Sequence, residues 1–309
     1  MLDKRLFKFP GARQALGVLS LLTLIQAIAI IGQGRFLSVA ITDLWGGHQL
    51  TSIGMVLVWF MLAYLLRQVM GVAKQYALAP FADKTTASLQ TQLTQKYAAL
   101  GPRTVANQGT GKSVTLAVEG IDQVHDYLTL VLVKLFDMSI TPWLILLYIA
   151  TINFKQAVFL FVIYPVIVIF MIVLGLAAQA KADREYETFN RLSNHFVDSL
   201  RGLTTLKQLG LAKQYAQNIY DVSEDHRKAT MSTLKIAILS TFALDFFTTL
   251  SIAVVALFLG LGLMDGATHL LPALTILVLA PEYFLPIRNF ANDYHATLNG
   301  KNALADIMT

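Results

Sequence analysis

Six long apolar runs divide the chain, at residues 16–41, 53–78, 127–152, 157–178, 234–264 and 270–290. Each reaches about 20 residues, the length of helix that crosses about 30 Å of hydrocarbon at 1.5 Å per residue. The first run is too long for a cleavable signal peptide and lacks an Ala-x-Ala-like exit, so we expect it to be retained. The pattern predicts an all-α integral membrane protein with six transmembrane helices.

Lysines and arginines gather in alternate gaps between these runs. They occur before the first run and throughout two long gaps, 79–126 and 179–233, whereas gaps 42–52 and 265–269 have none and gap 153–156 has only Lys155. Because positively charged loops stay in the cytoplasm, we expect both termini and the two long gaps on that side. The three short loops are then expected outside.

The composition agrees with a membrane protein and narrows its chemistry. The chain is 55% hydrophobic and 14% charged, with a net charge of +5 that suits a bilayer leaflet rich in anionic lipid and gives no reason to invoke nucleic acid. It has no cysteine, which excludes disulfides, thiolate metal sites and a cysteine nucleophile. The six histidines show no metal-ligand spacing, and no arrangement typical of catalytic residues occurs.

The two long gaps have the composition of helices rather than of linkers. Residues 82–100 contain no Gly or Pro before the Gly101-Pro102 break, and further helices are expected from about Lys112 into the third run and at 181–200 and 212–228. The sequence therefore predicts two long intracellular helical hairpins. Their turning points, around 101–111 and 201–211, are expected to dock a cytoplasmic partner.

One glycine-rich segment resembles a phosphate-binding loop without meeting its requirements. Gly109-Thr-Gly-Lys-Ser113 has the end of the pattern, but Ala106 stands where the first glycine is needed and no buried strand precedes it. We interpret it as a turn that starts an intracellular helix, with Thr110 or Ser113 near the cap.

Three charged residues lie deep inside the apolar runs. Counting from the span ends places Arg67, Asp245 and Glu282 about 16 to 21 Å into the membrane. An arginine there could bind a substrate carboxylate, and a carboxylate could bind an α-ammonium group, so they are candidates for a substrate path. Alternatively they pair with each other or with a partner subunit to fix helix packing. Arg288 is expected at the inner mouth of the same path.

The other charges in or near the spans have simpler explanations. Lys134 and Asp137 are three residues apart and are expected to form an ion pair on one helical face. Lys74 lies near the inner end of the second run and Arg35 near the outer end of the first, where snorkelling to the interface suffices. Glu119, Asp122 and Asp126 have the spacing i, i+3 and i+7 and form an acidic stripe on one helical face. We expect this face to be solvated or to contact a basic patch of a second subunit.

Several segments resemble a known family of transporters. The architecture resembles the type 1 transmembrane domain of ABC exporters, and specific segments are similar to the D subunit of the bacterial thiol-reductant exporter required for cytochrome bd assembly. These segments are 120–127 (GIDQVHDY), 191–202 (RLSNHFVDSLRG), 223–227 (SEDHR), 245–252 (DFFTTLSI), 279–288 (LAPEYFLPIR) and 293–296 (DYHA). The resemblance covers nearly the whole chain and is strongest from Arg191 onward.

The resemblance implies a function and an assembly. It implies a half-transporter that pairs with a homologous subunit in the bacterial cytoplasmic membrane and exports cysteine or glutathione, with ATP and magnesium bound on a separate ATP-binding domain. No such domain is recognisable up to Thr309, so we expect residues 1–309 to be the membrane domain alone. Coupling to that domain is expected at Gly101, Pro102 and Arg103 and at Arg201, Gly202 and Leu203.

Other functions stay open at this point. Haem or a haem-linked species is an alternative cargo for the same fold. A secondary transporter would predict broken helices at mid-membrane depth or an inverted repeat, against which the long hairpins argue. An assembly scaffold without transport would leave the mid-membrane charges without a role.

Overall fold

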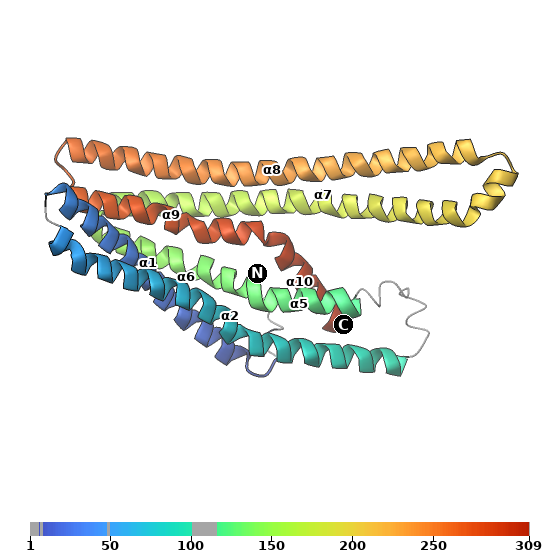
Figure 1. The fold of residues 1–309 in the computed structure, drawn as a ribbon, viewed down its shortest axis with the longest axis horizontal. Helices are drawn as coiled ribbons and strands as arrows, with labels where there is room; N and C mark the ends of the chain where they lie inside the picture. The colour runs from blue at the N-terminus through green and yellow to red at the C-terminus, as the bar shows by residue number, and fades with distance from the viewer. Residues whose placement is uncertain (1–5, 7–8, 48–49, 101–115, 309) are drawn as a thin grey trace. The chain divides into compact units, whose positions relative to one another are not determined.

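The computed structural model describes residues 6, 9–47, 50–100 and 116–308. Within these residues the structure is helical and contains no strand (Figure 1). The helices are α1 (Ala12–Trp45), α2 (Leu50–Leu100), the π-helix η2 (Leu116–Gly120), α5 (Ile121–Asp126), the π-helix η3 (Tyr127–Val131), α6 (Leu132–Ile152), α7 (Phe154–Gln208), α8 (Ala212–Met264), α9 (Leu270–Asn292) and α10 (Tyr294–Met308). Six of the helical segments described are long and apolar enough to cross a membrane. The chain is therefore a multi-pass membrane protein, as the hydropathy pattern predicts.

The chain divides into two compact units. The first unit comprises Met1–Pro165 and Thr248–Thr309, and the second comprises Val166–Phe247.

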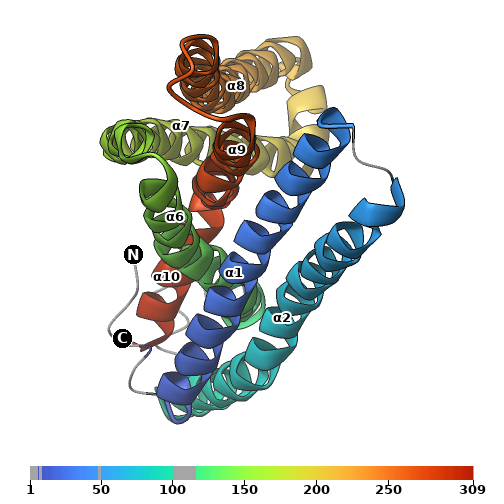
Figure 2. The ribbon, with the colours of Figure 1, turned by 90° about the vertical axis from the view of Figure 1, so that its left-hand side faces the viewer.

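Four helices build the core of the first unit. Helix α1 packs against α2 on one side and against α6 and α9 on the other, and α6 also packs against α9 (Figure 2). Gly34 allows this close packing, because a Cβ at that position would lie 2.7 Å from a terminal methyl of Leu279. Because the helices pack this tightly, the polar residues on their inner faces face one another.

Two tyrosines, the buried Tyr283 and the half-buried Tyr164, fix the start of α7 against this core. The Tyr283 hydroxyl donates to the Leu160 carbonyl at 3.1 Å, and the Tyr164 hydroxyl donates to the Met138 carbonyl at 2.9 Å. The two rings also contact each other, with centroids 5.6 Å apart. Each hydroxyl thereby has a partner inside an otherwise apolar layer, as a buried tyrosine requires.

The short helix α10 packs across the segment that leads into α6. It contacts α5, η2 and η3 (Figure 1). The contact is close at Gly300, where an added Cβ would lie 2.5 Å from the Cβ of Tyr127 and 2.6 Å from the Gln123 carbonyl oxygen. The acidic stripe of Glu119, Asp122 and Asp126 is exposed on this segment.

The second unit is a long helical hairpin made by parts of α7 and α8. The two helices of the hairpin contact each other through the rings of Phe170 and Phe247, whose centroids are 5.0 Å apart, and through a hydrogen bond from the Thr233 hydroxyl to the Lys181 carbonyl. Helix is present at 181–200 and at 212–228, where the sequence predicts it.

The turn of this hairpin is shorter than the sequence suggests. Helix α7 continues through Arg201 and Gly202 to Gln208, so the expected break around 201–211 is wrong over most of that range. The turn after the helix contains Gly210, which has a φ of +72°, and the Leu211 amide donates to the Leu206 carbonyl at 2.9 Å. This Schellman arrangement needs a residue that tolerates positive φ, and Gly210 meets that requirement. Gly202 lies inside α7 and does not have a positive φ.

The first long gap is described only in part. Helix α2 runs without interruption from Leu50 to Leu100, so the second span and the first limb of the hairpin are one helix. The expected turning point around 101–111, the coupling residues Gly101, Pro102 and Arg103, and the segment Gly109–Ser113 lie outside the described residues.

Candidate functional site

A network of polar side chains lies among α1, α2, α6 and α9 inside the first unit. Its basis is a spacing of seven residues on two neighbouring helices: Gln26 and Gln33 on α1, and Arg67 and Lys74 on α2. Seven residues are close to two helical turns, so each pair lies on one face of its helix. Because α1 and α2 pack along much of their length, these two faces meet.

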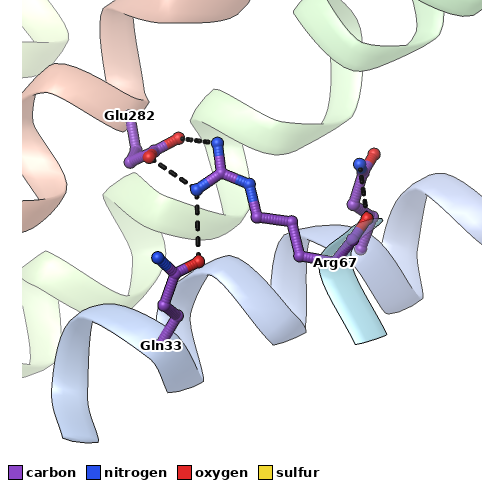
Figure 3. Close-up of polar contacts among 4 residues, drawn as sticks. Gln33, Arg67 and Glu282 are labelled. Atoms are coloured by element: carbon purple, nitrogen blue, oxygen red, sulfur yellow. Dashed lines mark hydrogen bonds and ion pairs between the residues drawn. The ribbon is translucent and has the colours of Figure 1, made fainter. Parts of the chain in front are cut away.

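The centre of the network is an ion pair between α2 and α9. Both guanidinium nitrogens of Arg67 donate to the carboxylate of Glu282, at 2.7 and 2.9 Å, and one of them also donates to the Gln33 amide oxygen at 3.2 Å (Figure 3). The Gln26 amide donates to the Arg67 backbone carbonyl at 3.1 Å. The arrangement is bidentate, which is the strongest geometry available to a guanidinium and a carboxylate. Two of the residues predicted for the substrate path therefore lie together.

A second ion pair lies near the first and corrects one sequence interpretation. Lys74 was expected to snorkel, but its side chain is only 1% exposed, and its ammonium donates to Asp137 on α6 and to the Gln26 amide oxygen, each at 2.5 Å. Burial of an ammonium group inside a membrane requires such partners, because hydrocarbon offers none. Gln26 thus contacts both Arg67 and Lys74, so it links the two ion pairs.

A third ion pair corrects the expectation that Lys134 pairs with Asp137. Lys134 instead donates to Asp293, the residue that ends α9 and precedes α10. The two residues on α6 are three apart, but each forms its ion pair with a residue outside α6. The prediction was wrong because packing between helices decided the partners.

These groups line a small, partly open cavity. Its volume is about 120 Å³. The charged residues in its lining are Arg67, Lys134, Asp137 and Glu282, so the formal charges of the lining sum to zero. Uncharged lining residues complete it, among them Gln26, Thr141, Pro286 and Asn289. Such a lining can bind a small zwitterion, with the carboxylate at an arginine or lysine and the ammonium at a carboxylate.

The remaining predicted site residues lie elsewhere. Asp245 is half-buried on α8 in the second unit, and Arg288 is exposed on α9 about one and a half turns beyond Glu282. Arg201 is exposed on α7, where Gly202 and the backbone of Leu203 are also helical. None of these five residues lines the cavity described above.

Sequence reasoning missed three members of the network. Gln26 and Gln33 were not considered, and Lys74 was assigned to the membrane surface. The signal that could have found them is the shared spacing of seven residues, because a polar stripe on one helix needs a polar stripe on its neighbour inside a membrane.

Comparisons with known proteins agree with this architecture. The profile of the family described as the ABC transporter transmembrane region matches residues 16–285. The chain is 51% identical, over 98% of its length and 53% of the relative's, to the glutathione/L-cysteine transport system ATP-binding/permease protein CydC of Bacillus subtilis. It is 34% identical, over 72% of its length and 39% of the relative's, to the CydD protein of the same transport system in Escherichia coli.

A third relative carries a different name. The chain is 31% identical, over 97% of its length and 52% of the relative's, to the transport ATP-binding protein AarD of Providencia stuartii. The chain spans about half the length of the curated relatives that it matches most fully. Relatives named for both subunits match, so the resemblance holds for the CydC and CydD type as a whole.

Proposed function

This chain belongs to the ABC transporter transmembrane family, and on that premise we propose that it forms the membrane-spanning part of an ATP-driven exporter of a small thiol, cysteine or glutathione. The proposal of a thiol substrate is supported by the names of relatives, which describe glutathione/L-cysteine transport. The proposal of a binding site is supported by the polar cavity in the first unit.

The main observation that supports a substrate-binding site is the Arg67–Glu282 ion pair, which lies beside a cavity whose lining has no net charge. Cysteine and glutathione each carry an α-ammonium and a carboxylate. An incoming substrate can exchange partners with the ion pair, so that its carboxylate accepts from Arg67 and its ammonium donates to Glu282. For cysteine, which has one ammonium and one carboxylate, no charge is left without a partner during this exchange, which keeps the cost of desolvation low.

The size of the cavity favours a small cargo. Pockets for drug-sized ligands typically measure about 300–1,000 Å³, whereas this cavity measures about 120 Å³. Haem or a haem-linked species stays the alternative cargo, and it would need a wider arrangement of the same helices. The small volume therefore supports cysteine, the smaller of the two thiols, over haem.

The proposed assembly follows from the family. The chain would pair with a homologous subunit in the bacterial cytoplasmic membrane, with both termini and the hairpins in the cytoplasm and export in support of cytochrome bd assembly. ATP and magnesium would bind ATP-binding domains outside residues 1–309. The residues around 101–103 and the turn at Leu209–Leu211, together with the neighbouring residues 201–203, would transmit the motion of those domains.

Transport into inverted membrane vesicles tests the proposal. Vesicles that contain the full-length protein and its partner subunit are expected to accumulate labelled cysteine or glutathione only with ATP. ATP-independent accumulation would point to a secondary transporter, and no accumulation of either thiol would contradict thiol export. Labelled haem in a parallel sample distinguishes the alternative cargo.

Variants of the ion pair separate substrate binding from packing. Arg67→Gln and Glu282→Gln are expected to lower transport at least about tenfold through loss of a charge-assisted contact. The exchange Arg67→Glu with Glu282→Arg restores the pair but reverses its direction, so it is expected to restore folding and not transport. Lys84→Gln, an exposed change on α2, is the matched control. Full transport by the exchanged protein would leave only a packing role.

A further inference from the structure

A second cavity lies where the short loops join the helices of the first unit. It measures about 660 Å³ and is lined by the α6–α7 junction, residues 152–159, and by the end of α8 with the loop that follows, at Phe258, Gly262, Ala267 and Thr268. Both junctions are short loops with few or no lysines and arginines, so they are expected on the outer face of the membrane. The cavity is therefore at the outer rim of the membrane domain and separate from the polar network.

The first turn of α7 forms the polar floor of this cavity. Asn153 accepts the first bonds of the helix: its carbonyl accepts from the Ala157 amide at 3.1 Å, and its side-chain oxygen accepts from the Gln156 amide at 3.3 Å. Lys155 follows in the same turn and is exposed. A helix N-terminus and an adjacent lysine both favour an anion.

Gln156 provides an independent sign of a missing ligand. Gln156 lines the cavity and is only 8% exposed, yet its amide oxygen has no hydrogen-bond partner among the described residues. A residue at this position often reaches back to the amide of the capping residue, but the Asn153 amide already donates to the Ile149 carbonyl at 2.8 Å. A buried acceptor without a donor is costly, so a donor from a ligand is expected here.

The walls of the cavity are apolar and open to lipid. Phe154 is 71% exposed and Phe258 is 54% exposed, and Phe159 also lines the cavity. Lys155 is the one charged residue in the lining, so the lining carries a formal charge of +1. A bound molecule that matches this site has one negative charge, a hydroxyl or other donor close to that charge, and a hydrocarbon part.

We propose that this cavity binds the headgroup of an anionic glycerophospholipid of the outer leaflet, phosphatidylglycerol. Its phosphate accepts from the Lys155 ammonium at the N-terminus of α7. A headgroup hydroxyl donates to the amide oxygen of Gln156, and the acyl chains lie along the phenylalanines. Phosphatidylethanolamine fits less well, because it has no net charge and would bring its ammonium close to that of Lys155.

Native mass spectrometry of the full-length protein with its partner subunit in detergent tests the lipid site. Phosphatidylglycerol is titrated against phosphatidylethanolamine and phosphatidylcholine. The wild type is expected to retain phosphatidylglycerol preferentially, and Lys155→Gln to weaken that binding about tenfold by removing a charge-assisted contact. Gln156→Leu is expected to weaken it as well, although it removes an unsatisfied buried acceptor and so should not impair folding.

Matched controls and opposing outcomes make the result decisive. Lys84→Gln and Gln90→Leu change the same residue types at exposed positions of α2 and are expected to leave lipid binding unchanged. Equal retention of all three lipids by the wild type, or unchanged binding in both cavity variants, would overturn the proposal. A cross-link from Lys155 to the partner subunit that fills the cavity would overturn it too. The measurement involves no transport, so its outcome is independent of the thiol-export hypothesis.

Discussion

Removing one charge from the Arg67–Glu282 pair should destabilise the protein, and removing both should cost less than the sum of the two. In Glu282→Gln the guanidinium of Arg67 keeps its bond to Gln33 and loses two bonds to a carboxylate. In Arg67→Gln the carboxylate of Glu282 loses its bidentate partner. In the double variant no uncompensated charge stays in the site.

The geometry sets the size of this effect. Two unit charges about 4 Å apart attract by about 4 kcal/mol at an effective dielectric constant of about 20. Breaking a buried pair by removing one partner costs about 3–5 kcal/mol. The two side chains are 20% and 23% exposed, so water or detergent can partly solvate the remaining charge. We therefore expect each single change to lower the free energy of unfolding by about 3 kcal/mol, the lower end of that range.

A double-mutant cycle measures the coupling. The full-length protein in mixed micelles is titrated with sodium dodecyl sulfate, and unfolding is followed by tryptophan fluorescence. The two single effects should sum to about 6 kcal/mol and the double variant should lose about 3–4, which gives a coupling of about 2–3 kcal/mol. Lys84→Gln should change stability by less than about 0.5 kcal/mol. Additive single effects would refute the inference that the two residues act as a pair.

Three further changes test other parts of the structure by the same titration. Lys74→Met should lower the free energy of unfolding by about 3 kcal/mol, because it leaves Asp137 without its cation, and adding Asp137→Asn should recover part of this loss. An equal loss in the single and the double variant would contradict the pairing. Gly300→Ala should cost about 1–3 kcal/mol because its Cβ would lie 2.6 Å from backbone, whereas Gly202→Ala, in open helix, should gain about 0.5–1. Gly210→Ala should cost about 1–2 kcal/mol at its φ of +72°, and no loss would show that the turn relaxes.

The membrane spans and the depth of the charged residues could be predicted from the sequence, since both depend on distance along one helix. The length of an apolar run gives the span, and counting from its ends places Arg67 and Glu282 at depth. The sequence also raised their pairing with each other as one alternative. It could not choose that alternative, because the choice depends on which helices are neighbours.

The errors occurred where partners come from different helices. The charges of Lys134 and Asp137 on α6 satisfy the spacing rule for a local pair, yet Lys134 binds Asp293 at the end of α9 and Asp137 binds Lys74 on α2. The rule describes an isolated helix in water, where a neighbour three residues away is the nearest charge. Inside a bundle that is poor in water, the nearest charge belongs to whichever helix packs closest.

The turn of the second unit shows a similar limit. A glycine permits a helix to end but does not require it, so Gly202 and Gly210 look equivalent in the sequence. The difference lies in the residues around them: the amide of Leu211 reaches the carbonyl of Leu206 and closes the helix at Gly210. That closure depends on backbone geometry and not on composition.

The Lys134–Asp293 pair connects the polar cavity to the junction between α9 and α10. Lys134 lines the cavity, and Asp293 lies where α9 ends and α10 begins. A ligand that draws the ammonium of Lys134 towards itself therefore competes with the residue that holds this junction. Thermodynamic linkage is reciprocal. If occupancy of the cavity changes the equilibrium for displacing α10, displacement of α10 must change the affinity of the cavity by the same factor. Occupancy of the cavity and displacement of α10 are thus thermodynamically coupled. A calorimetric measurement of either one reports on the other.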